Sequence, residues 1–150
     1  MQESIYLDTS VPSAYYDNRA KERKEATFNF WKDILPNYKV FISEITLEEL
    51  RSTKNVVLRN HFLKLVSHFK ILNMNNRTEE LANAYIKNDI IPEKYIYDAY
   101  HAAIATCHNI NYLVSWNFDH LVKAKTRRLI NSVNILEGYG PIEIIAPPEL

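Results

Sequence analysis

The sequence Ile5-Tyr6-Leu7-Asp8-Thr9-Ser10 joins a short apolar run to an acid and two hydroxyl residues. Three consecutive apolar residues are typical of a short buried strand. Thr9 and Ser10, followed closely by Pro12, are typical of a helix N-terminus, because proline suits the first helical turn. The segment therefore predicts a strand that runs directly into a helix, with Asp8 at the carboxyl end of the strand.

The same alternation of strand and helix continues along the chain. Further short strands are expected at residues 40–42, 70–72, 112–114 and 142–145. Helices are expected at about residues 20–35, 56–69, 78–87, 93–108 and 121–130, with a short one capped by Ser43 or Thr46. We find no repeat or linker, so we expect a single domain over residues 1–150. The pattern predicts an α/β fold, a three-layer α/β/α sandwich with a mostly parallel central sheet.

The composition of the chain argues against several classes of protein. Lys plus Arg and Asp plus Glu both number 18, and this balance argues against a protein that holds nucleic acid by bulk charge alone. The only glycines, Gly138 and Gly140, lie in the tail, so no glycine-rich loop is available for nucleotide phosphates. The single Cys107 can form neither an internal disulfide nor a zinc cage. A membrane span needs about 18 apolar residues, and no apolar run approaches this length. Residues 1–4 do not resemble a secretory signal. We therefore expect a cytoplasmic protein without a membrane segment.

Oxygen-bearing side chains occur in four separated stretches. These stretches are Ile5–Ser10, Ile42–Leu50, Tyr97–Ala103 and Leu113–His120. Ligands of parallel sheets bind beyond the carboxyl ends of the strands, and gathered carboxylate oxygens suit a hard divalent cation. The constellation indicates metal-assisted phosphodiester chemistry, because a cation neutralises charge on the phosphodiester and lowers the pKa of a bound water.

In their order and spacing, these stretches resemble the PIN domain, and within it the VapC-like ribonuclease toxins of prokaryotic toxin–antitoxin pairs. The matching motifs are Leu7–Ser10, Ser43 with Thr46–Leu50, Asp98–Ala105 and Leu113–Asn117, and together they span nearly the whole chain. The resemblance implies a parallel sheet between helices, with an acidic pocket that binds Mg²⁺ or Mn²⁺ and cleaves RNA. It also implies a homodimer and a small antitoxin protein that buries the pocket.

The expected catalytic and metal-binding residues are Asp8, Glu49, Asp98 and Asn117. Glu48 competes with Glu49, because neighbours on a helix point about 100° apart and only one of them can face the pocket. The family pattern, in which the acid directly precedes Leu50, favours Glu49. Glu48 is then a solvated surface charge.

At Asn117 the chain departs from the commoner family pattern, which has an acid at this position. The asparagine carbonyl can hold a metal or a water but adds no charge, so we expect weaker cation binding than in a four-acid pocket. Asp119 is near enough to compensate, although a helix N-terminal acid explains it at least as well. His120 is a candidate for contact with a phosphate or a leaving group.

Four further residues are candidates for supporting roles. Ser10 and Ser43 are placed to orient a ligand or a water, and Ser115 is a further candidate of this kind. Ordinary helix capping explains Ser10 and Ser43 equally well. His101 lies three residues after Asp98 and could hydrogen-bond a pocket carboxylate, but a packed structural histidine is the favoured role.

Two basic runs are candidates for contact with RNA phosphates. They consist of Arg19, Lys21, Arg23 and Lys24, and of Lys123, Lys125, Arg127 and Arg128. Tyr15, Tyr16 and Trp116 are candidates for stacking on bases. The alternatives are solvated basic faces and, for Trp116, a place in the core.

The leading hypothesis is a metal-dependent endoribonuclease with RNA as its substrate, the toxin of a toxin–antitoxin pair. The alternative is a catalytically weak PIN-like module that binds RNA or a protein partner without cleavage, a hypothesis based on Asn117 and the balanced charge. A DNA nuclease of the flap type is less favoured, because the chain lacks helical insertions large enough to thread a strand.

Overall fold

A five-stranded sheet with the order β3-β2-β1-β4-β5 forms the centre of the computed structural model, which describes residues 2–150. The strands are β1 (Ser4–Leu7), β2 (Lys39–Ser43), β3 (Lys70–Leu72), β4 (Tyr112–Val114) and β5 (Glu143–Ile145). Every neighbouring pair is parallel, so the expectation of a mostly parallel sheet is confirmed and the sheet is fully parallel. Asp8 follows the central strand.

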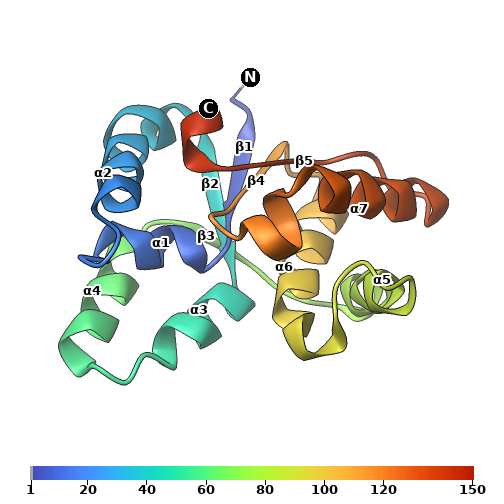
Figure 1. Cartoon of the computed structure of the whole chain (residues 1–150), viewed down its shortest axis with the longest axis horizontal. Coiled ribbons are helices and arrows are strands. Elements are labelled where there is room, and N and C mark those ends of the chain that lie inside the picture. Colours follow the sequence, from blue (N-terminus) through green and yellow to red (C-terminus); the bar gives the residue numbers. More distant parts are fainter. Residues whose placement is uncertain (1) are drawn as a thin grey trace.

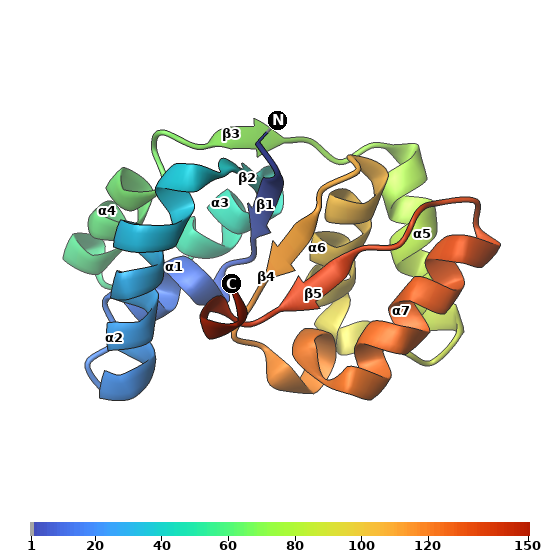
Figure 2. The ribbon, with the colours of Figure 1, turned by 90° about the horizontal axis from the view of Figure 1, so that it is seen from above.

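Helices cover both faces of the sheet (Figure 1). They are α1 (Ser10–Tyr15), α2 (Lys21–Asn29), α3 (Glu44–Arg51), α4 (Val56–Leu65), α5 (Asn76–Lys87), α6 (Ile96–Cys107) and α7 (Ala124–Leu136). Seen from above, α1, α2 and α4 lie on one side of the strands, and α5, α6 and α7 lie on the other (Figure 2). The predicted three-layer α/β/α architecture is therefore confirmed. Within residues 2–150, no helix combines the length and the apolar character needed to cross a bilayer.

The alternation of side chains along β1 divides the core into two clusters. Ile5 and Leu7 pack with residues of α1 and α4, whereas Tyr6 packs with residues of α5 and α6. All three β1 residues have no exposed surface, as expected of a central strand covered on both faces. The alanines of α6, which include Ala99, Ala102 and Ala103, are also fully buried and let this helix approach closely. Tyr6 packs in the same cluster as these alanines, and this packing fixes the position of the end of β1.

In the first half of the chain, the helices depart from their predicted bounds at their ends. The expected helix at residues 20–35 consists of α2, a π-helical segment (Phe30–Ile34) and a 3₁₀ turn (Leu35–Asn37). The expected helix at residues 56–69 ends at Leu65. The amides of Ser67 and Phe69 turn back to the carbonyls of Lys64 and Val66, which directs the chain into β3.

In the second half, a cap, a 3₁₀ turn and a π-helical turn move three helix starts. Helix α5 begins at Asn76 because Asn75 accepts a hydrogen bond from the Thr78 amide as its N-cap. A 3₁₀ turn (Glu93–Tyr95) precedes α6. The expected helix at residues 121–130 is a π-helical turn (Phe118–Val122) followed by α7, which extends beyond the predicted end to Leu136. These differences lie outside the strands.

Side chains close the β5 edge of the sheet. The Asn131 side chain donates to the Ile142 carbonyl at 2.9 Å and accepts from the Ile142 amide at 2.7 Å. Arg127 donates to the Ile144 carbonyl at 3.1 Å. Helix α7 therefore satisfies backbone groups that an edge strand would otherwise present to a new strand.

Candidate active site

Asp8 is held by two serines at the junction of β1, α1 and β4. Its Oδ1 atom accepts hydrogen bonds from the Ser10 amide at 3.0 Å and the Ser10 hydroxyl at 2.5 Å, and its Oδ2 atom accepts from the Ser115 hydroxyl at 2.5 Å. Thr9 is the N-cap residue of α1 and makes no side-chain cap bond. Of the two roles considered for Ser10, the structure therefore shows contact with the carboxylate rather than helix capping.

The Asp8 carboxyl lies in an environment that disfavours its charge. Only 3% of the residue is exposed. Burial raises the pKa of Asp8, and the charge of Asp98 acts in the same direction. The charge of His101 and the two serine hydroxyls lower the pKa of Asp8 but only partly offset this effect. Negative charge at this position is thus incompletely compensated by the protein.

Glu49, rather than Glu48, faces the same region. Its Oε1 atom accepts a hydrogen bond from the Thr9 hydroxyl at 2.6 Å and lies 2.7 Å from Nε2 of His101. Glu48 is exposed and instead accepts a hydrogen bond from the Tyr97 hydroxyl at 2.6 Å. The rotation between neighbouring helical residues separates the two acids as predicted.

Ser43 supports α3 instead of contacting a carboxylate. Its hydroxyl accepts from the amides of Ile45 at 3.1 Å and Thr46 at 3.4 Å, while the Thr46 side chain accepts from the Ser43 amide. The same hydroxyl lies 2.7 Å from the Tyr6 hydroxyl. Ser43 therefore caps the helix that carries Glu49 and ties it to the central strand.

His101 is both a packed residue and a partner of a carboxylate. It is 1% exposed, and its ring lies between Glu49 and the Tyr6 hydroxyl, which is 2.6 Å from Nδ1. Burial disfavours the charged imidazole, but Glu49, Asp8 and Asp98 together raise the pKa of His101 above its ordinary value. Burial also acts against the charged carboxylate, yet His101 and Thr9 hold the pKa of Glu49 below its ordinary value. The raised pKa of His101 and the lowered pKa of Glu49 both favour the charged forms, so the two side chains form an ion pair.

Asp98 lies in the first turn of α6 and contacts the loop after β4. Its Oδ2 atom is 3.1 Å from Nδ1 of His120, and 18% of its side chain is exposed. Burial raises the pKa of Asp98, with the charges of His101 and His120 and a hydrogen bond from Asn117 acting against it. As for Asp8, the surrounding protein only partly compensates the negative charge of this carboxylate.

Asn117 connects the loop to both aspartates. Its amide donates to the Ser115 hydroxyl at 2.9 Å, and its side-chain oxygen accepts from the His120 amide at 3.1 Å. Asn117 is thus the N-cap of the π-helical turn that carries His120. Asp119 is exposed in the first turn of this segment, which is the position of a helix N-terminal acid.

Three acids near the carboxyl ends of the central strands act electrostatically on His101. Asp8 comes from the end of β1, Glu49 from α3 and Asp98 from α6, and all three interact electrostatically with His101. Among residues 2–150, however, no three His, Cys, Asp or Glu side chains are close enough to form a ready-made metal cage. Mg²⁺ usually binds one or two carboxylates and keeps several waters or substrate phosphate oxygens. The donor set fits such an ion in chemical type, and a cation would stabilise the ionised form of the two aspartates, which burial disfavours.

Sequence reasoning missed Thr9 and Tyr6, which contact Glu49 and His101 respectively. The position of Thr9, next to Asp8 on the edge that carries the acids, was a usable signal. Tyr6 lies within an apolar strand, and no sequence pattern distinguished its hydroxyl from that of a surface tyrosine. Its role depends on burial by α5 and α6, which is a tertiary effect.

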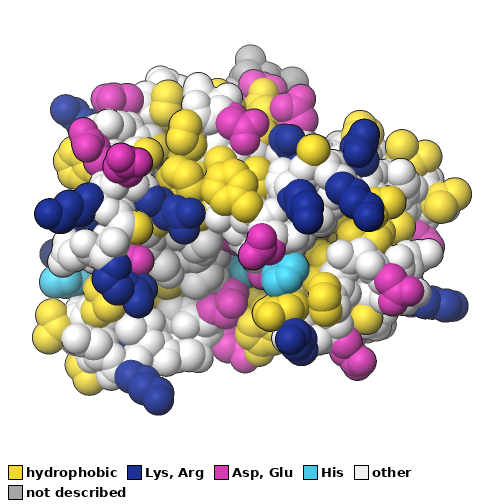
Figure 3. All heavy atoms as spheres, viewed as in Figure 1, with side chains coloured by type: hydrophobic (Ala, Val, Ile, Leu, Met, Phe, Trp, Pro, Cys, Tyr) yellow, Lys and Arg dark blue, Asp and Glu magenta, His cyan; other side chains and the backbone are white. Residues whose placement is uncertain are grey.

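The two basic runs lie at the surface, and some of their members make local contacts. In the first, Arg19 pairs with Asp17 at 3.0 Å and Arg23 lies over the Trp116 ring. In the second, Lys123 and Lys125 are exposed, and Arg127 is used by the β5 edge. Figure 3 shows Lys and Arg side chains on both sides of the acidic and histidine side chains on one face of the molecule.

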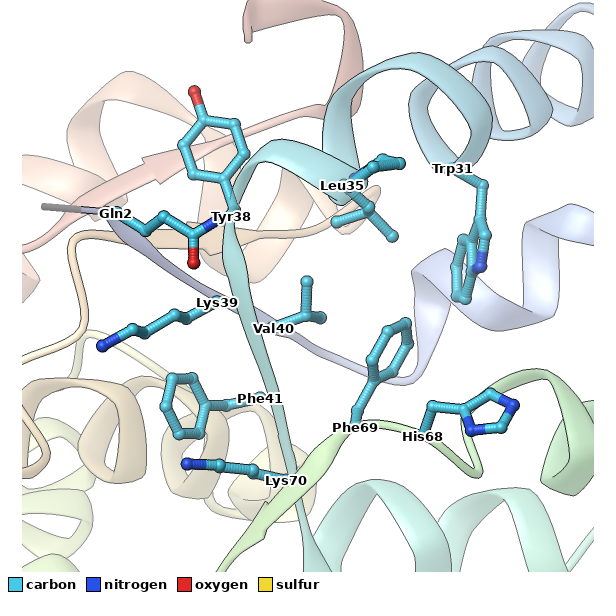
Figure 4. A pocket seen from close by; sticks show the side chains of 11 residues that line it. Gln2, Trp31, Leu35, Tyr38, Lys39, Val40, Phe41, His68, Phe69 and Lys70 are labelled. Atoms are coloured by element: carbon cyan, nitrogen blue, oxygen red, sulfur yellow. The ribbon is translucent and has the colours of Figure 1, made fainter.

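A separate hollow of about 510 Å³ lies at the other end of the strands (Figure 4). Its lining includes Trp31, Phe69 and Val40 together with Lys39 and Lys70. These residues belong to the start of β2 and β3 and to the segments just before them. None of the four expected ligands lines this hollow.

The sequence matches the family model of the PIN domain over residues 5–125. The chain therefore belongs to the PIN domain family. No curated protein resembles it closely enough in sequence to count as a match. Its fold, however, is similar to those of several solved VapC and VapBC structures.

One is VapBC2 from Rickettsia felis bound to a DNA fragment from its promoter, with a TM-score of 0.63, 16% identity, and coverage of 95% of this chain and 98% of the other. A second is VapBC-1 from nontypeable Haemophilus influenzae, with a TM-score of 0.62, 18% identity, and coverage of 97% and 98%. A third is VapC20 from Mycobacterium tuberculosis, described as a toxin that cleaves the sarcin–ricin loop, with a TM-score of 0.58, 16% identity, and coverage of 77% and 92%. The protein thus has a VapC-like PIN fold.

Proposed function

We propose that this protein is a metal-dependent endoribonuclease that hydrolyses RNA phosphodiester bonds and acts as the toxin of a toxin–antitoxin pair. The observation that carries the proposal is the meeting of Asp8, Glu49 and Asp98 around buried His101, with the pKa of both aspartates raised by burial. Residues whose pKa is shifted by burial and by specific charged neighbours cluster at functional sites, which supports a functional role for these carboxylates. Membership of the PIN family, whose members are typically nucleases, supports the same conclusion.

The proposed ligands of Mg²⁺ or Mn²⁺ are Asp8, Glu49 and Asp98, with the second lone pair of the Asn117 side-chain oxygen as a neutral fourth donor. When bound, such an ion neutralises charge on the phosphodiester and lowers the pKa of a water. Ser10 and Ser115 orient the Asp8 carboxylate, and His101 orients that of Glu49. His120 lies beside Asp98, where its imidazole can approach a substrate phosphate.

The proposal extends to partners and location. Similar structures include toxin–antitoxin complexes, which supports a small antitoxin protein as the partner of this chain. We also propose a homodimer in the cytoplasm, which the single Cys107 permits because no disulfide has to form.

The test compares two adjacent glutamates. Purified protein is incubated with labelled RNA in Mg²⁺, in Mn²⁺ and in a chelator, and initial cleavage rates are measured. Glu49→Gln should lower the rate at least about 100-fold, because loss of a metal-site carboxylate removes both a ligand and a charge. Glu48→Gln, one residue away and exposed, should retain the rate of the unmodified protein within about twofold.

Asp8→Asn and Asp98→Asn should also abolish cleavage, with circular dichroism showing that the fold is intact. Equal cleavage by the Glu49→Gln and Glu48→Gln variants would contradict the proposed site. Cleavage that continues in the chelator would contradict the metal requirement.

A second candidate function is an RNA-binding module that does not cleave. The observation in its favour is that Asn117 replaces an acid and already caps the turn of His120. Calorimetry with Mn²⁺ separates the two candidates. If calorimetry detects no Mn²⁺ binding at millimolar concentration while the protein still binds RNA, the result would favour the binding module.

A further inference from the structure

A groove of about 670 Å³ lies between α2, the segment after β4 and the C-terminal end of the chain. Its apolar lining includes Ala20, Trp116 and Pro148. Its cationic lining consists of Lys21 and Arg23, against the single acid Glu22. An apolar surface with excess positive charge is complementary to a nucleotide, which combines a flat base with an anionic phosphate.

Trp116 connects this groove to the candidate active site. Its amide donates to the Ser10 hydroxyl at 2.8 Å, and the same hydroxyl donates to Asp8. The residue whose ring lines the groove is thus joined through its backbone and Ser10 to Asp8.

The indole ring has a defined orientation. Its Nε1 atom donates to the Thr27 hydroxyl at 2.9 Å, and Thr27 is fully buried and in turn donates to the Arg23 carbonyl at 2.7 Å. The ring is only partly buried, and it contributes to the lining of the groove. A ring fixed at one edge and open over part of its surface is a suitable platform for stacking, because little conformational entropy is lost on binding.

Arg23 covers this platform in the free protein. Its guanidinium carbon lies 5.1 Å from the centre of the Trp116 ring, and the residue is exposed. Within residues 2–150, Arg23 forms no ion pair. It can therefore leave the ring without breaking a salt bridge and still reach an anion at the rim of the groove.

We propose that this groove binds one nucleotide of single-stranded RNA next to the bond that is cut, with its base stacked on Trp116 and its phosphate held by Arg23 and Lys21. The inference rests on the proposed ribonuclease function and adds a substrate-binding subsite to it. Bases in a duplex are already stacked on one another, so only an unpaired base reaches the ring. Replacing the Arg23 contact on the Trp116 ring with a stacked base is favourable. Stacking of a base on an aromatic ring is worth about five- to 150-fold in affinity, whereas an exposed cation–π contact is worth only about two- to fivefold.

Tryptophan fluorescence tests the proposal directly. Trp31 and Trp116 are the only tryptophans, so Trp31→Phe leaves Trp116 as the sole source of tryptophan emission. A 12-nucleotide single-stranded RNA is titrated into this variant in a chelator, which prevents metal-dependent cleavage. We expect saturable quenching of Trp116, and at least fivefold weaker quenching with a duplex of the same length.

The affinities of substituted proteins for the labelled 12-nucleotide RNA are then compared with that of the unmodified protein. Trp116→Ala should weaken binding about tenfold, within the range of one lost stacking contact, and Trp116→Phe should weaken it less. Arg23→Ala should weaken binding about two- to fivefold, whereas the control Arg77→Ala, an exposed arginine at the same 5.1 Å from the ring of Tyr139, should stay within twofold. Equal affinity of the unmodified protein and both Trp116 variants would overturn the proposal, as would equal quenching by duplex RNA.

The outcomes separate this inference from the proposed function. Quenching of Trp116 without cleavage in Mn²⁺ would support the groove and contradict the nuclease. Cleavage with unchanged KM and kcat in both Trp116→Ala and Trp116→Phe would support the nuclease and overturn the groove.

Discussion

Replacing His101 with alanine removes the buried imidazole that joins Glu49 to the central strand. The His101 ring is 2.7 Å from Glu49 and 2.6 Å from the Tyr6 hydroxyl, and it is 1% exposed. We expect this substitution to destabilise the protein in a pH-dependent manner. His101→Gln is the matched control, because its side-chain amide can still donate a hydrogen bond to Glu49 but carries no charge.

The expected loss of unfolding free energy in His101→Ala follows from how exposed His101 and Glu49 are. A hydrogen bond to a charged group contributes about 1.5–3 kcal/mol, and the 30% exposure of the Glu49 side chain places this one toward the lower end, at about 2 kcal/mol. For a chain of 150 residues, this loss lowers the melting temperature by about 4–8 °C. His101→Gln should lose about half as much free energy of unfolding, because it loses the positive charge but keeps a hydrogen bond to the Glu49 carboxylate.

The sign of the pH dependence follows from the two pKa shifts. The pKa of His101 is raised in the folded state, so its contribution is complete below the ordinary value of 6.5 and is lost as the pH rises through the folded-state pKa. The pKa of Glu49 is lowered, so its contribution is complete above its ordinary value of 4.5 and is lost as the pH falls through the folded-state pKa. The pair therefore stabilises the protein most between about pH 4.5 and 6.5.

Urea unfolding of the three proteins at pH 6 and at pH 9 measures this effect. The difference in the free energy of unfolding between the unmodified protein and His101→Gln should be largest at pH 6 and should shrink at pH 9. A difference that is the same at both pH values would refute the charged pair. A loss below about 0.5 kcal/mol in His101→Ala, the range of ordinary surface substitutions, would refute the structural importance of the contact.

Three further predictions concern the same site. Asp8→Asn should raise the stability of the metal-free protein at pH 7 by about 1 kcal/mol, measured by thermal unfolding, because burial raises the pKa of Asp8 and the ionised form is the costly one; a lower melting temperature would contradict this. Asn117→Asp should strengthen Mn²⁺ binding about tenfold in calorimetry, since a further unit charge at about 4 Å contributes ~1–4 kcal/mol; unchanged affinity would place Asn117 outside the metal site. Ser43→Ala should cost about 1–2 kcal/mol in urea unfolding through loss of the α3 cap and of its contact with Tyr6, and no change would show that Thr46 alone supports this turn.

The strands and the positions of Asp8 and Glu49 followed from local sequence patterns. The apolar run before Asp8 predicted β1 and its carboxyl end, because a buried parallel strand has few other compositions. The choice of Glu49 over Glu48 needed only helical geometry and the family pattern. In each case the determining residues lie within a few positions of one another.

The environment of His101 and the role of Ser43 could not be predicted in the same way. His101, Glu49 and Tyr6 are far apart in sequence, and their contact depends on how α3 and α6 pack against β1. Capping and ligand orientation require the same hydroxyl side chains, so the sequence left both roles open for Ser10 and Ser43. The structure assigns Ser10 to the carboxylate and Ser43 to the helix cap.

The contacts of α7 with β5 limit how this protein can associate with other chains. Asn131 and Arg127 already occupy the outward backbone groups of Ile142 and Ile144, so an incoming extended peptide would have to displace them before it could hydrogen-bond there. Extension of the sheet is thereby directed to the opposite margin, where Ile71 of β3 is 51% exposed. Stacking of copies through both margins into a continuous fibre is correspondingly disfavoured.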